Sequence, residues 1–466
     1  MAAVYFALFV WVLASLIAPR RERPPAPAGP AESPRVLPVA AVCTALAACF
    51  AVTIAALASA TTHPPGSLSS VARLPIRVLS DAGAGDAETS NVMQALALAE
   101  AALLYLLYRL LAGRRVTPPV VALVGATFAA FLVGALASPA SQSTDAYGYV
   151  SFALQPGIAY APQGIPFTGD HAVLNGLFGT PRPAAYYGPL WIWFSHLVVA
   201  PFPTLVAQLY ALRAVEALAL IACIALLARL GVPFATLALV AVDPTVFLLW
   251  IVDGHNDLAG VALVLAGAAL GASPAARVAL VAAAGLVKLP LVAIGAVVFA
   301  SEPSRVRRFA LPAAAVVLCV AASLAFGGRA YAVHLLTPLP VKPPTAAERL
   351  LHACDALVAV AALAVALAAR RFTFGTVWVW PALAGFVAPW YGVWCLPYAL
   401  ASGTLAAFLI AEPAVAYLSS WNYVATPFSI AGSVALVFGP LLAAAFARVR
   451  RSGAARRPSH PRGAIS

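Results

Sequence analysis

Two acids and an imidazole stand together between two apolar runs of the chain. Residues 252–257 read Val-Asp-Gly-His-Asn-Asp, in a sequence that is 63% hydrophobic and only 9% charged. Asp253 and Asp257 are four residues apart, so on a helix they share one face. Paired carboxylates suit acid–base chemistry or a divalent cation, and His255 can donate to a phosphate oxygen or join a metal site. Helix capping at a hairpin turn, with hydrogen bonding by Asn256, is the alternative.

A further carboxylate, Asp145, follows directly after an apolar run, in the polar stretch from Ser143 to Tyr149. Partial loss of water there raises the pKa of a carboxyl group towards a value useful for taking a proton from a hydroxyl. Asp145 is therefore a candidate general base. The alternative is that Asp145 or Thr144 caps a short surface helix.

Lys288 is one of two lysines in the chain and lies midway through the apolar run 276–301. An ammonium group in that position needs an anionic partner or an aqueous cavity. A phosphate group would satisfy it, as would Asp253 or Asp257. Extension of the side chain to the membrane interface is the alternative.

Other candidates are an arginine and two aromatic segments. Arg213 lies near one end of the apolar run 207–229, where it can meet a phosphate or pair with Glu216. Segments 186–191 and 389–394 are rich in tyrosine and tryptophan. An interfacial aromatic belt explains such residues, and stacking against a sugar is the alternative.

The elements that must position these residues are membrane helices. The mean hydropathy is +0.93, and apolar runs long enough to cross a bilayer recur along the chain. We expect an all-α, polytopic transmembrane bundle of about 13–15 crossings. Residues 1–447 form one integral membrane domain, and 448–466 form a basic, disordered cytoplasmic tail. The expected spans are 2–18, 37–59, 92–112, 118–138, 207–229, 233–251, 257–273, 309–326, 351–369, 374–389, 404–419 and 427–447, with a short piece near 392–402 and the broken run 276–301 in addition.

The net charge of +12 does not indicate a nucleic-acid partner, because the arginine clusters adjoin apolar runs in the manner of cytoplasmic topology signals. With those clusters inside, the loop 139–187, the turn 253–257, Lys288 and the pair Trp390–Tyr391 all fall on the extracytoplasmic side. The segment 188–205 is expected to be an interfacial helix. Pro290 is expected to divide the run around Lys288 into two short helices in a re-entrant arrangement.

Five short motifs follow one another along the chain: Asp145-x-Tyr-x-Tyr149, Tyr187-Gly-Pro-Leu190, Gly254-His-Asn-Asp257, Val287-Lys-Leu-Pro290 and Pro389-Trp-Tyr391. Taken together, over roughly residues 140–400, the chain resembles bacterial polyprenol-phosphate-mannose-dependent α-(1→6)-mannosyltransferases of the GT-C superfamily. The resemblance implies transfer of a hexose, mannose first, from a polyprenyl-phosphate donor to a glycan or glycolipid acceptor, with inversion. The reaction would occur on the outer face of the bacterial cytoplasmic membrane.

The resemblance also implies residue roles. Asp145 would be the catalytic base, while Lys288, His255 and Arg213 would offset charge on the donor phosphate. The residues expected to bind substrate are Tyr147, Tyr149, Tyr187, Arg213, Asp253, His255, Asn256, Asp257, Lys288, Trp390 and Tyr391. No cofactor is required, although Mg²⁺ or Mn²⁺ serves some members of the superfamily.

Two departures keep alternatives open. Asp243-Pro244 stands where the resemblance leads us to expect Asn-Pro, and the loop after Tyr149 differs from the mannosyltransferase pattern. A GT-C enzyme for glucose or arabinose is therefore one alternative. A polytopic secondary transporter is another, because broken helices and buried charges are features of transporters as well.

Overall fold

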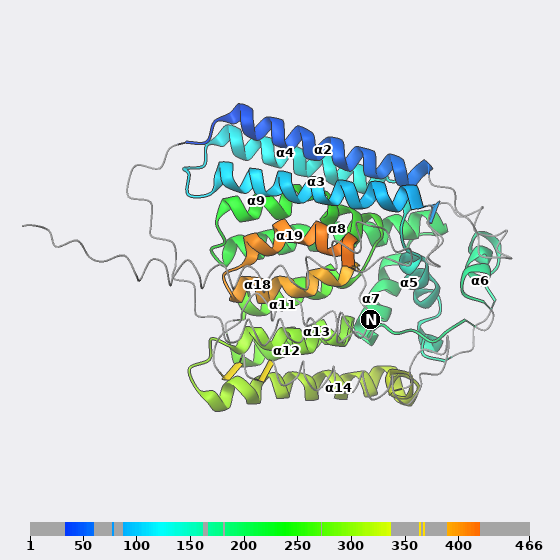
Figure 1. Ribbon diagram of the computed structural model, residues 1–466. Helices are drawn as coiled ribbons and strands as arrows, with labels where there is room; N and C mark the ends of the chain where they lie inside the picture. The colour runs from blue at the N-terminus through cyan, green and yellow to red at the C-terminus, as the bar shows by residue number, and fades with distance from the viewer. Residues whose placement is uncertain are drawn as a thin grey trace, which may run out of the picture.

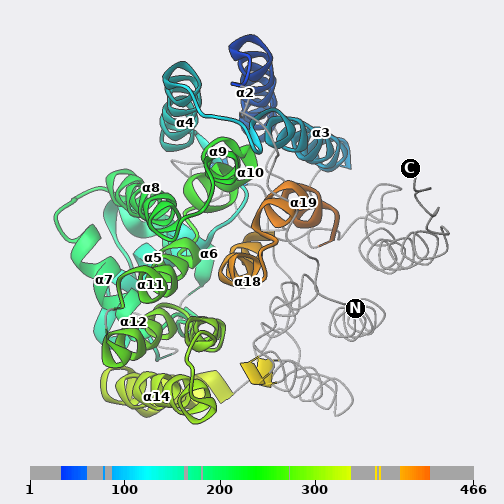
Figure 2. The same cartoon turned by 90° about the vertical axis from the view of Figure 1, so that its left-hand side faces the viewer.

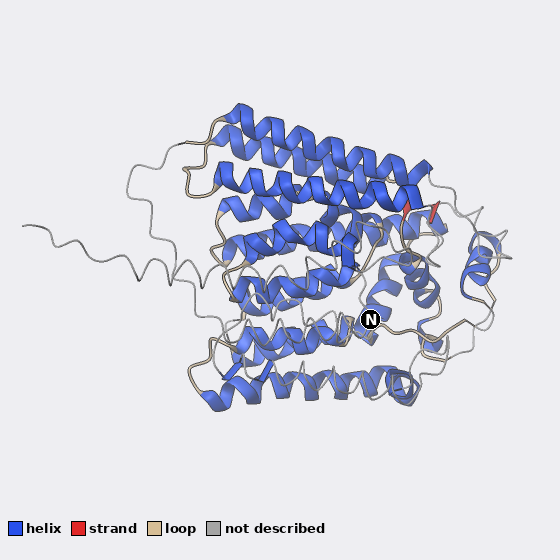
Figure 3. Ribbon diagram, in the orientation of Figure 1, coloured by secondary structure: helices blue, strands red, loops and turns tan. Residues whose placement is uncertain are grey.

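The computed structural model describes residues 33–59, 77–78, 87–161, 166–179, 182–271, 273–336, 363–364, 367–368 and 389–419. These residues form helices and connecting turns, apart from a two-residue parallel pairing of β1 (Arg77–Val78) with β2 (Ala140–Ser141) (Figure 3). The all-α fold class expected from the apolar runs is confirmed.

Three long helices lie along one edge of the bundle: α2 (Val36–Ser59), α3 (Ala87–Leu111) and α4 (Pro118–Ala137) (Figures 1 and 2). Aromatic side chains join them to the interior. Phe50 and Phe131 lie with ring centroids 4.8 Å apart, and Phe131 meets Phe247 edge-on at 5.3 Å.

The helical segment that follows α8 (Leu205–Arg229) is bent. After α8 the chain forms α9 (Phe234–Val242), α10 (Pro244–Val246) and the π-helical η4 (Phe247–Val252). The axis bends by 52° between α9 and α10. Pro244 has no backbone N–H and cannot continue the helix before it, whereas the Asp243 carboxylate accepts a hydrogen bond from Thr245 N at 3.0 Å and begins a new one. The expected span 233–251 is thus bent and consists of two helical pieces.

The run around Lys288 divides as expected. α11 (Asp257–Leu270) is followed by α12 (Pro274–Val287), α13 (Pro290–Ile294) and η5 (Gly295–Phe299), and Lys288 between α12 and α13 has an extended backbone with φ −151°. The chain continues in α14 (Arg305–Leu336), which is interrupted at Gly328 with φ +65°.

Short helices gather at one end of the bundle (Figure 1). They are α5 (Asp145–Ala153), η2 (Pro156–Ile158), η3 (Gly169–Ala172), α6 (Val173–Phe178) and α7 (Pro189–Val199). Towards the C-terminus, η6 (Pro389–Cys395), α18 (Leu396–Ala401) and α19 (Leu405–Ser419) pack into the bundle. At 11 residues α7 is apolar but too short to cross a bilayer, and its expected interfacial position stays a prediction.

Length and composition identify this as an integral membrane protein. Four described helices are long and apolar enough to cross a bilayer: Val36–Ala58, Pro118–Ala137, Leu205–Arg229 and Arg305–Tyr331, and the bent pair would be a fifth. α3 covers the expected span 92–112 but is not among these four. The expected spans 2–18 and 427–447, most of 351–369, all of 374–389 except Pro389, and the tail 448–466 lie outside the described residues. The number of crossings therefore stays a prediction.

Candidate active site

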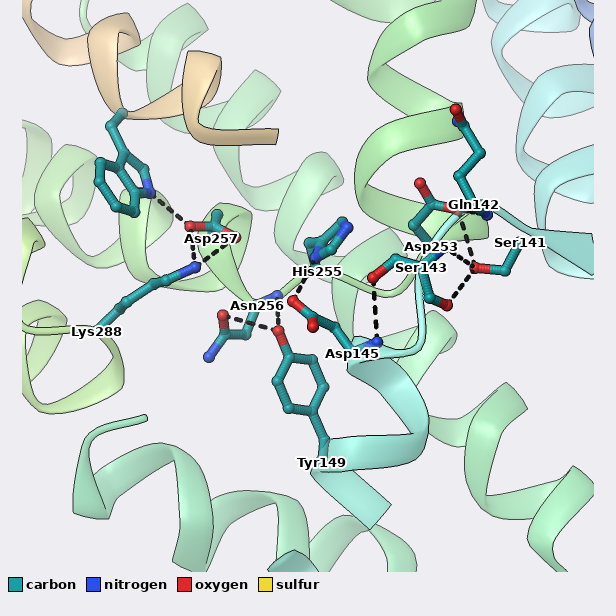
Figure 4. Close-up of polar contacts among 11 residues, drawn as sticks. Ser141, Gln142, Ser143, Asp145, Tyr149, Asp253, His255, Asn256, Asp257 and Lys288 are labelled. Atoms are coloured by element: carbon teal, nitrogen blue, oxygen red, sulfur yellow. Dashed lines mark hydrogen bonds and ion pairs between the residues drawn. The ribbon is translucent and has the colours of Figure 1, made fainter. Parts of the chain in front are cut away.

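Asp145 and His255, 110 residues apart in the chain, meet where α5 begins (Figure 4). Asp145 Oδ2 lies 3.1 Å from His255 Nδ1, and the Asp145 backbone N–H donates to Ser143 Oγ at 3.1 Å. The His255 side chain is fully buried, whereas the Asp145 side chain remains 27% exposed. Asp145 is therefore the carboxylate of this cluster that a substrate can still reach.

The electrostatic surroundings of Asp145 differ from the sequence-based expectation. Burial raises its pKa, but the hydrogen bond from His255 and the positive charges of His255 and Lys288 outweigh burial, so the pKa lies below its ordinary value. The expected rise in pKa is wrong, because hydrogen bonds and opposite charges favour the ionised form. Asp145 is thus a carboxylate at neutral pH and needs no prior loss of a proton to act as a base.

The turn before His255 fixes the loop that carries Asp145. Asp253 Oδ1 accepts hydrogen bonds from Ser141 Oγ at 2.9 Å and from Gln142 N at 2.7 Å (Figure 4). Burial raises the pKa of Asp253 to about 6, against the opposing effect of these bonds and of nearby positive charge. One oxygen of the Asp253 carboxylate thus binds the loop that precedes α5, and its expected role in substrate binding stays a prediction.

Gly254 makes the sharp turn between Asp253 and His255 possible. Its φ is +69°, a backbone conformation that costs side-chain-bearing residues about 1–2 kcal/mol. A Cβ on Gly254 would also lie 3.1 Å from Ala146 Cβ on α5. The π-helical η4 ends immediately before this turn, and π-helical turns are frequent at functional sites.

Tyr149 and Asn256 form a second link between α5 and the turn. The Tyr149 hydroxyl donates to Asn256 Oδ1 at 3.2 Å and accepts from Asn256 N at 3.3 Å. Both residues are buried, and the Tyr149 ring meets Tyr187 edge-on at 4.6 Å. Tyr149 and Asn256 therefore set the distance between α5 and α11.

Lys288 finds its anionic partner in Asp257. Its Nζ lies 2.8 Å from Asp257 Oδ1 and 3.1 Å from Oδ2, and Trp394 Nε1 donates to Oδ1 at 2.6 Å (Figure 4). Nζ also lies 4.5 Å from the ring centroid of Tyr391 and 5.9 Å from that of Tyr187. The extended backbone between α12 and α13 directs the ammonium into this aromatic enclosure, where cation–π contacts add to the ion pair.

The remaining expected residues lie nearby in different settings. Arg213 is buried and its Nη1 donates to Ser138 O at 2.7 Å, which holds the end of α4. Tyr147 is 1% exposed and packs in the hydrophobic cluster beneath α5. Tyr391 stacks on Trp394 at 4.2 Å. The side chain of Trp390 lies outside the described residues, so its expected role stays a prediction.

The structure brings together the loop that carries Asp145, the 253–257 turn, Lys288 and Tyr391, and the side of the membrane on which they lie stays a prediction. Four residues to which the sequence analysis assigned no individual role complete the site: Ser141, Gln142, Ser143 and Trp394. Three of them are polar and follow one another just after α4, and this polar run after an apolar span is the feature of the sequence that could have predicted them. Trp394 stands three residues after Tyr391 in an aromatic segment.

Within the described residues, no three His, Cys, Asp or Glu side chains are grouped so that they could hold a metal ion, and the expected use of Mg²⁺ or Mn²⁺ stays a prediction. The Asp257 carboxylate is paired with Lys288, and Asp145 with His255.

Comparison of the chain with protein-family models, with curated proteins and with solved structures found no match.

Proposed function

We propose that the protein is a membrane glycosyltransferase that moves a hexose from a polyprenyl-phosphate donor to a glycan or glycolipid acceptor. Mannose is the first candidate, and glucose or arabinose are the alternatives. The reaction would take place on the extracytoplasmic face of the bacterial cytoplasmic membrane. The observation that carries the proposal is Asp145, an ionised and partly exposed carboxylate beside a buried imidazole and a buried lysine.

In this mechanism Asp145 removes the proton from the acceptor hydroxyl as that oxygen forms a bond to the anomeric carbon of the donor. The bond from the anomeric carbon to the phosphate oxygen breaks on the opposite face, so the configuration inverts. Polyprenyl phosphate leaves with the electron pair. Lys288 and His255 supply the preorganised positive charge and hydrogen-bond donor that favour charge growing on the leaving phosphate.

The proposal is tested by supplying the purified protein in detergent with polyprenyl-phosphate mannose, glucose or arabinose, each radiolabelled in the sugar, together with a mixture of glycan acceptors. We expect label to pass from one of these donors to an acceptor and polyprenyl phosphate to be released in equal amount. Absence of transfer from all three donors would contradict the proposal.

One observation favours a second candidate, secondary transport. Three buried carboxylates, Glu100, Asp243 and Glu412, lie in the bundle at or near the 52° bend, and Thr245 joins the first two through its hydroxyl and backbone N–H. Within the described residues none of the three takes part in an ion pair. Broken helices with buried acids are sites of ion coupling in transporters.

Transport predicts uptake of a sugar or phosphate ester into proteoliposomes driven by a proton or sodium gradient, and loss of that uptake in Glu412→Gln. The glycosyltransferase predicts no such uptake by the wild-type protein. The same proteoliposomes, given labelled donor and acceptor on the outside, would show transfer instead.

A further inference from the structure

Arg182, between α6 and α7, is a buried cation outside the cluster of Asp145 and Lys288. It is 3% exposed, and its guanidinium lies 5.0 Å from the ring centroid of Phe152 and 5.8 Å from that of Phe167. Its Nη1 donates to Ser151 O in the last turn of α5. Burial lowers the pKa of Arg182 to about 10, so the side chain is still charged at neutral pH.

The other two nitrogens of Arg182 are unsatisfied. Among the residues that the structure describes, the buried Nε and Nη2 have no hydrogen-bond partner, and Arg182 forms no ion pair. Nε and Nη2 form one edge of the planar guanidinium, the fork that binds a carboxylate or phosphate through two parallel hydrogen bonds. A buried charge and two buried donors are each unfavourable when left alone. The chemistry that would satisfy all three at once is a bidentate anion.

The surroundings connect Arg182 with the candidate active site. The Phe152 ring lies 6.3 Å from that of Tyr187, and Tyr187 in turn faces both Tyr149 and Lys288. Ser151 follows Asp145 by six residues on α5, which is about 9 Å along the helix axis. Aromatic side chains thus extend from the catalytic carboxylate to the arginine, and aromatic faces are suited to packing against sugar rings.

We propose that Arg182 binds an anionic group of the acceptor, a phosphate or a carboxylate, at a distance from the hydroxyl that reacts. The inference rests on the proposed glycosyl transfer. The donor phosphate is bonded to the carbon under attack, so it must lie beside Asp145 and Lys288. Arg182 contacts the far end of α5, which leaves the acceptor as the substrate whose anion reaches it.

A purely structural role is the competing explanation. Arg182 would then only cap the C-terminal turn of α5, where a cation is favourable, and pack against two phenyl rings. That role predicts a loss of stability on substitution but no dependence on anions, and this difference separates the two explanations.

The direct test is anion-dependent thermal unfolding of the full-length protein in detergent at constant ionic strength, with chloride replaced by inorganic phosphate, glycerol 1-phosphate or glucuronate. We expect at least one of these to raise the melting temperature of wild type and of Asp145→Asn. The shift should be lost in Arg182→Gln and reduced in Arg182→Lys, which keeps the charge and loses the fork. Arg277→Gln is the matched control, since Arg277 is paired with Glu302 at 2.6 Å.

The pattern across the probes identifies the anion: phosphate esters alone indicate a phosphorylated acceptor, and glucuronate alone indicates a sugar acid. A shift that survives in Arg182→Lys and Arg182→Gln, or no shift in wild type with any probe, would overturn the proposal. Because Asp145→Asn is expected to keep the shift, this outcome is independent of whether the protein transfers sugar.

Kinetics provide the second readout once an acceptor is known. Arg182→Gln should raise KM for an anionic acceptor about tenfold or more, because the loss of one charged hydrogen bond weakens binding by about this factor. The kcat should stay near that of wild type. KM for the neutral form of the same acceptor should not change. Equal effects on the two acceptors would contradict the assignment.

Discussion

Lys288 Nζ and Asp257 Oδ1 lie 2.8 Å apart, in a pair that joins α11 to the break between α12 and α13. Asp257 is fully buried, and the Lys288 side chain is 11% exposed. The pair therefore neutralises two charges inside an apolar bundle and places an ammonium group beside Tyr391, Trp394 and Tyr187. Lys288 is therefore a structural group in this bundle, and under the proposed function it is also a cation that a donor phosphate can approach.

Removing one member of this pair should be far more harmful than removing both. We expect Lys288→Met to destabilise the protein by about 3–5 kcal/mol, because it leaves the Asp257 carboxylate buried without a cation. Lys288→Met combined with Asp257→Asn should recover most of that loss. Unfolding in detergent, followed by circular dichroism, measures both. Simple additivity of the two single changes would show that the ion pair does not stabilise the fold.

Gly254→Ala should impair the site more than the fold. Alanine at φ +69° is unfavourable by about 1–2 kcal/mol, and its Cβ would meet Ala146, so the turn that carries His255 must shift. Gly113→Ala is the matched control, because Gly113 has φ +72° and nothing within 4 Å of an added Cβ. We expect similar losses of stability in the two variants and a loss of transfer in Gly254→Ala alone. Full activity of Gly254→Ala would contradict the role of this turn.

His255 should set the acid side of the pH–rate profile. In the wild type the pKa of Asp145 lies below its ordinary value of about 3.9, so the base stays ionised as pH falls to that region. His255→Gln removes the imidazole and its charge, which raises the pKa of Asp145 and moves the acid limb of kcat/KM to higher pH. The lowered pKa of Asp145 also stabilises the folded protein at pH values above the pKa that Asp145 has in the unfolded chain. This stabilisation is lost as the pH falls through the pKa of Asp145 in the folded protein.

The measurement is the dependence of kcat/KM on pH for wild type and His255→Gln, over the range in which both remain folded by circular dichroism. An acid limb at the same pH in both proteins would mean that His255 does not control the ionisation of Asp145.

The sequence was sufficient to predict much of the architecture. Long apolar runs predict helices because every backbone polar group in hydrocarbon must be bonded within its own segment. Pro290 predicts the break beside Lys288, since proline cannot continue a helix. Positive-inside topology placed Asp145, the 253–257 turn and Lys288 on one side, and the structure brings them into contact.

The finer assignments depended on contacts between distant segments, which no local pattern reveals. Asp253 Oδ1 accepts hydrogen bonds from Ser141 and Gln142 across more than 100 residues, so this carboxylate oxygen is already bonded within the protein. The direction of the Asp145 pKa depends on His255 and Lys288, not on burial alone. Trp394 bonds to Asp257 across 137 residues. These pairings follow from how the helices pack, so they cannot be predicted from the spacing of residues within each segment.

The central claim is that Asp145 is the base for glycosyl transfer, and its most direct test is the single-turnover rate of transfer by Asp145→Asn. Asparagine keeps the shape but cannot accept the proton. Asp170→Asn is the matched control, since Asp170 is exposed and its carboxylate accepts a hydrogen bond from Leu205 N, which an amide oxygen can replace. We predict a fall of about 100-fold or more for Asp145→Asn in protein that remains folded at the assay temperature, with a lower melting temperature because the contact with the His255 imidazole is weakened, and a wild-type rate for Asp170→Asn. Transfer at the wild-type rate by Asp145→Asn would contradict the assignment.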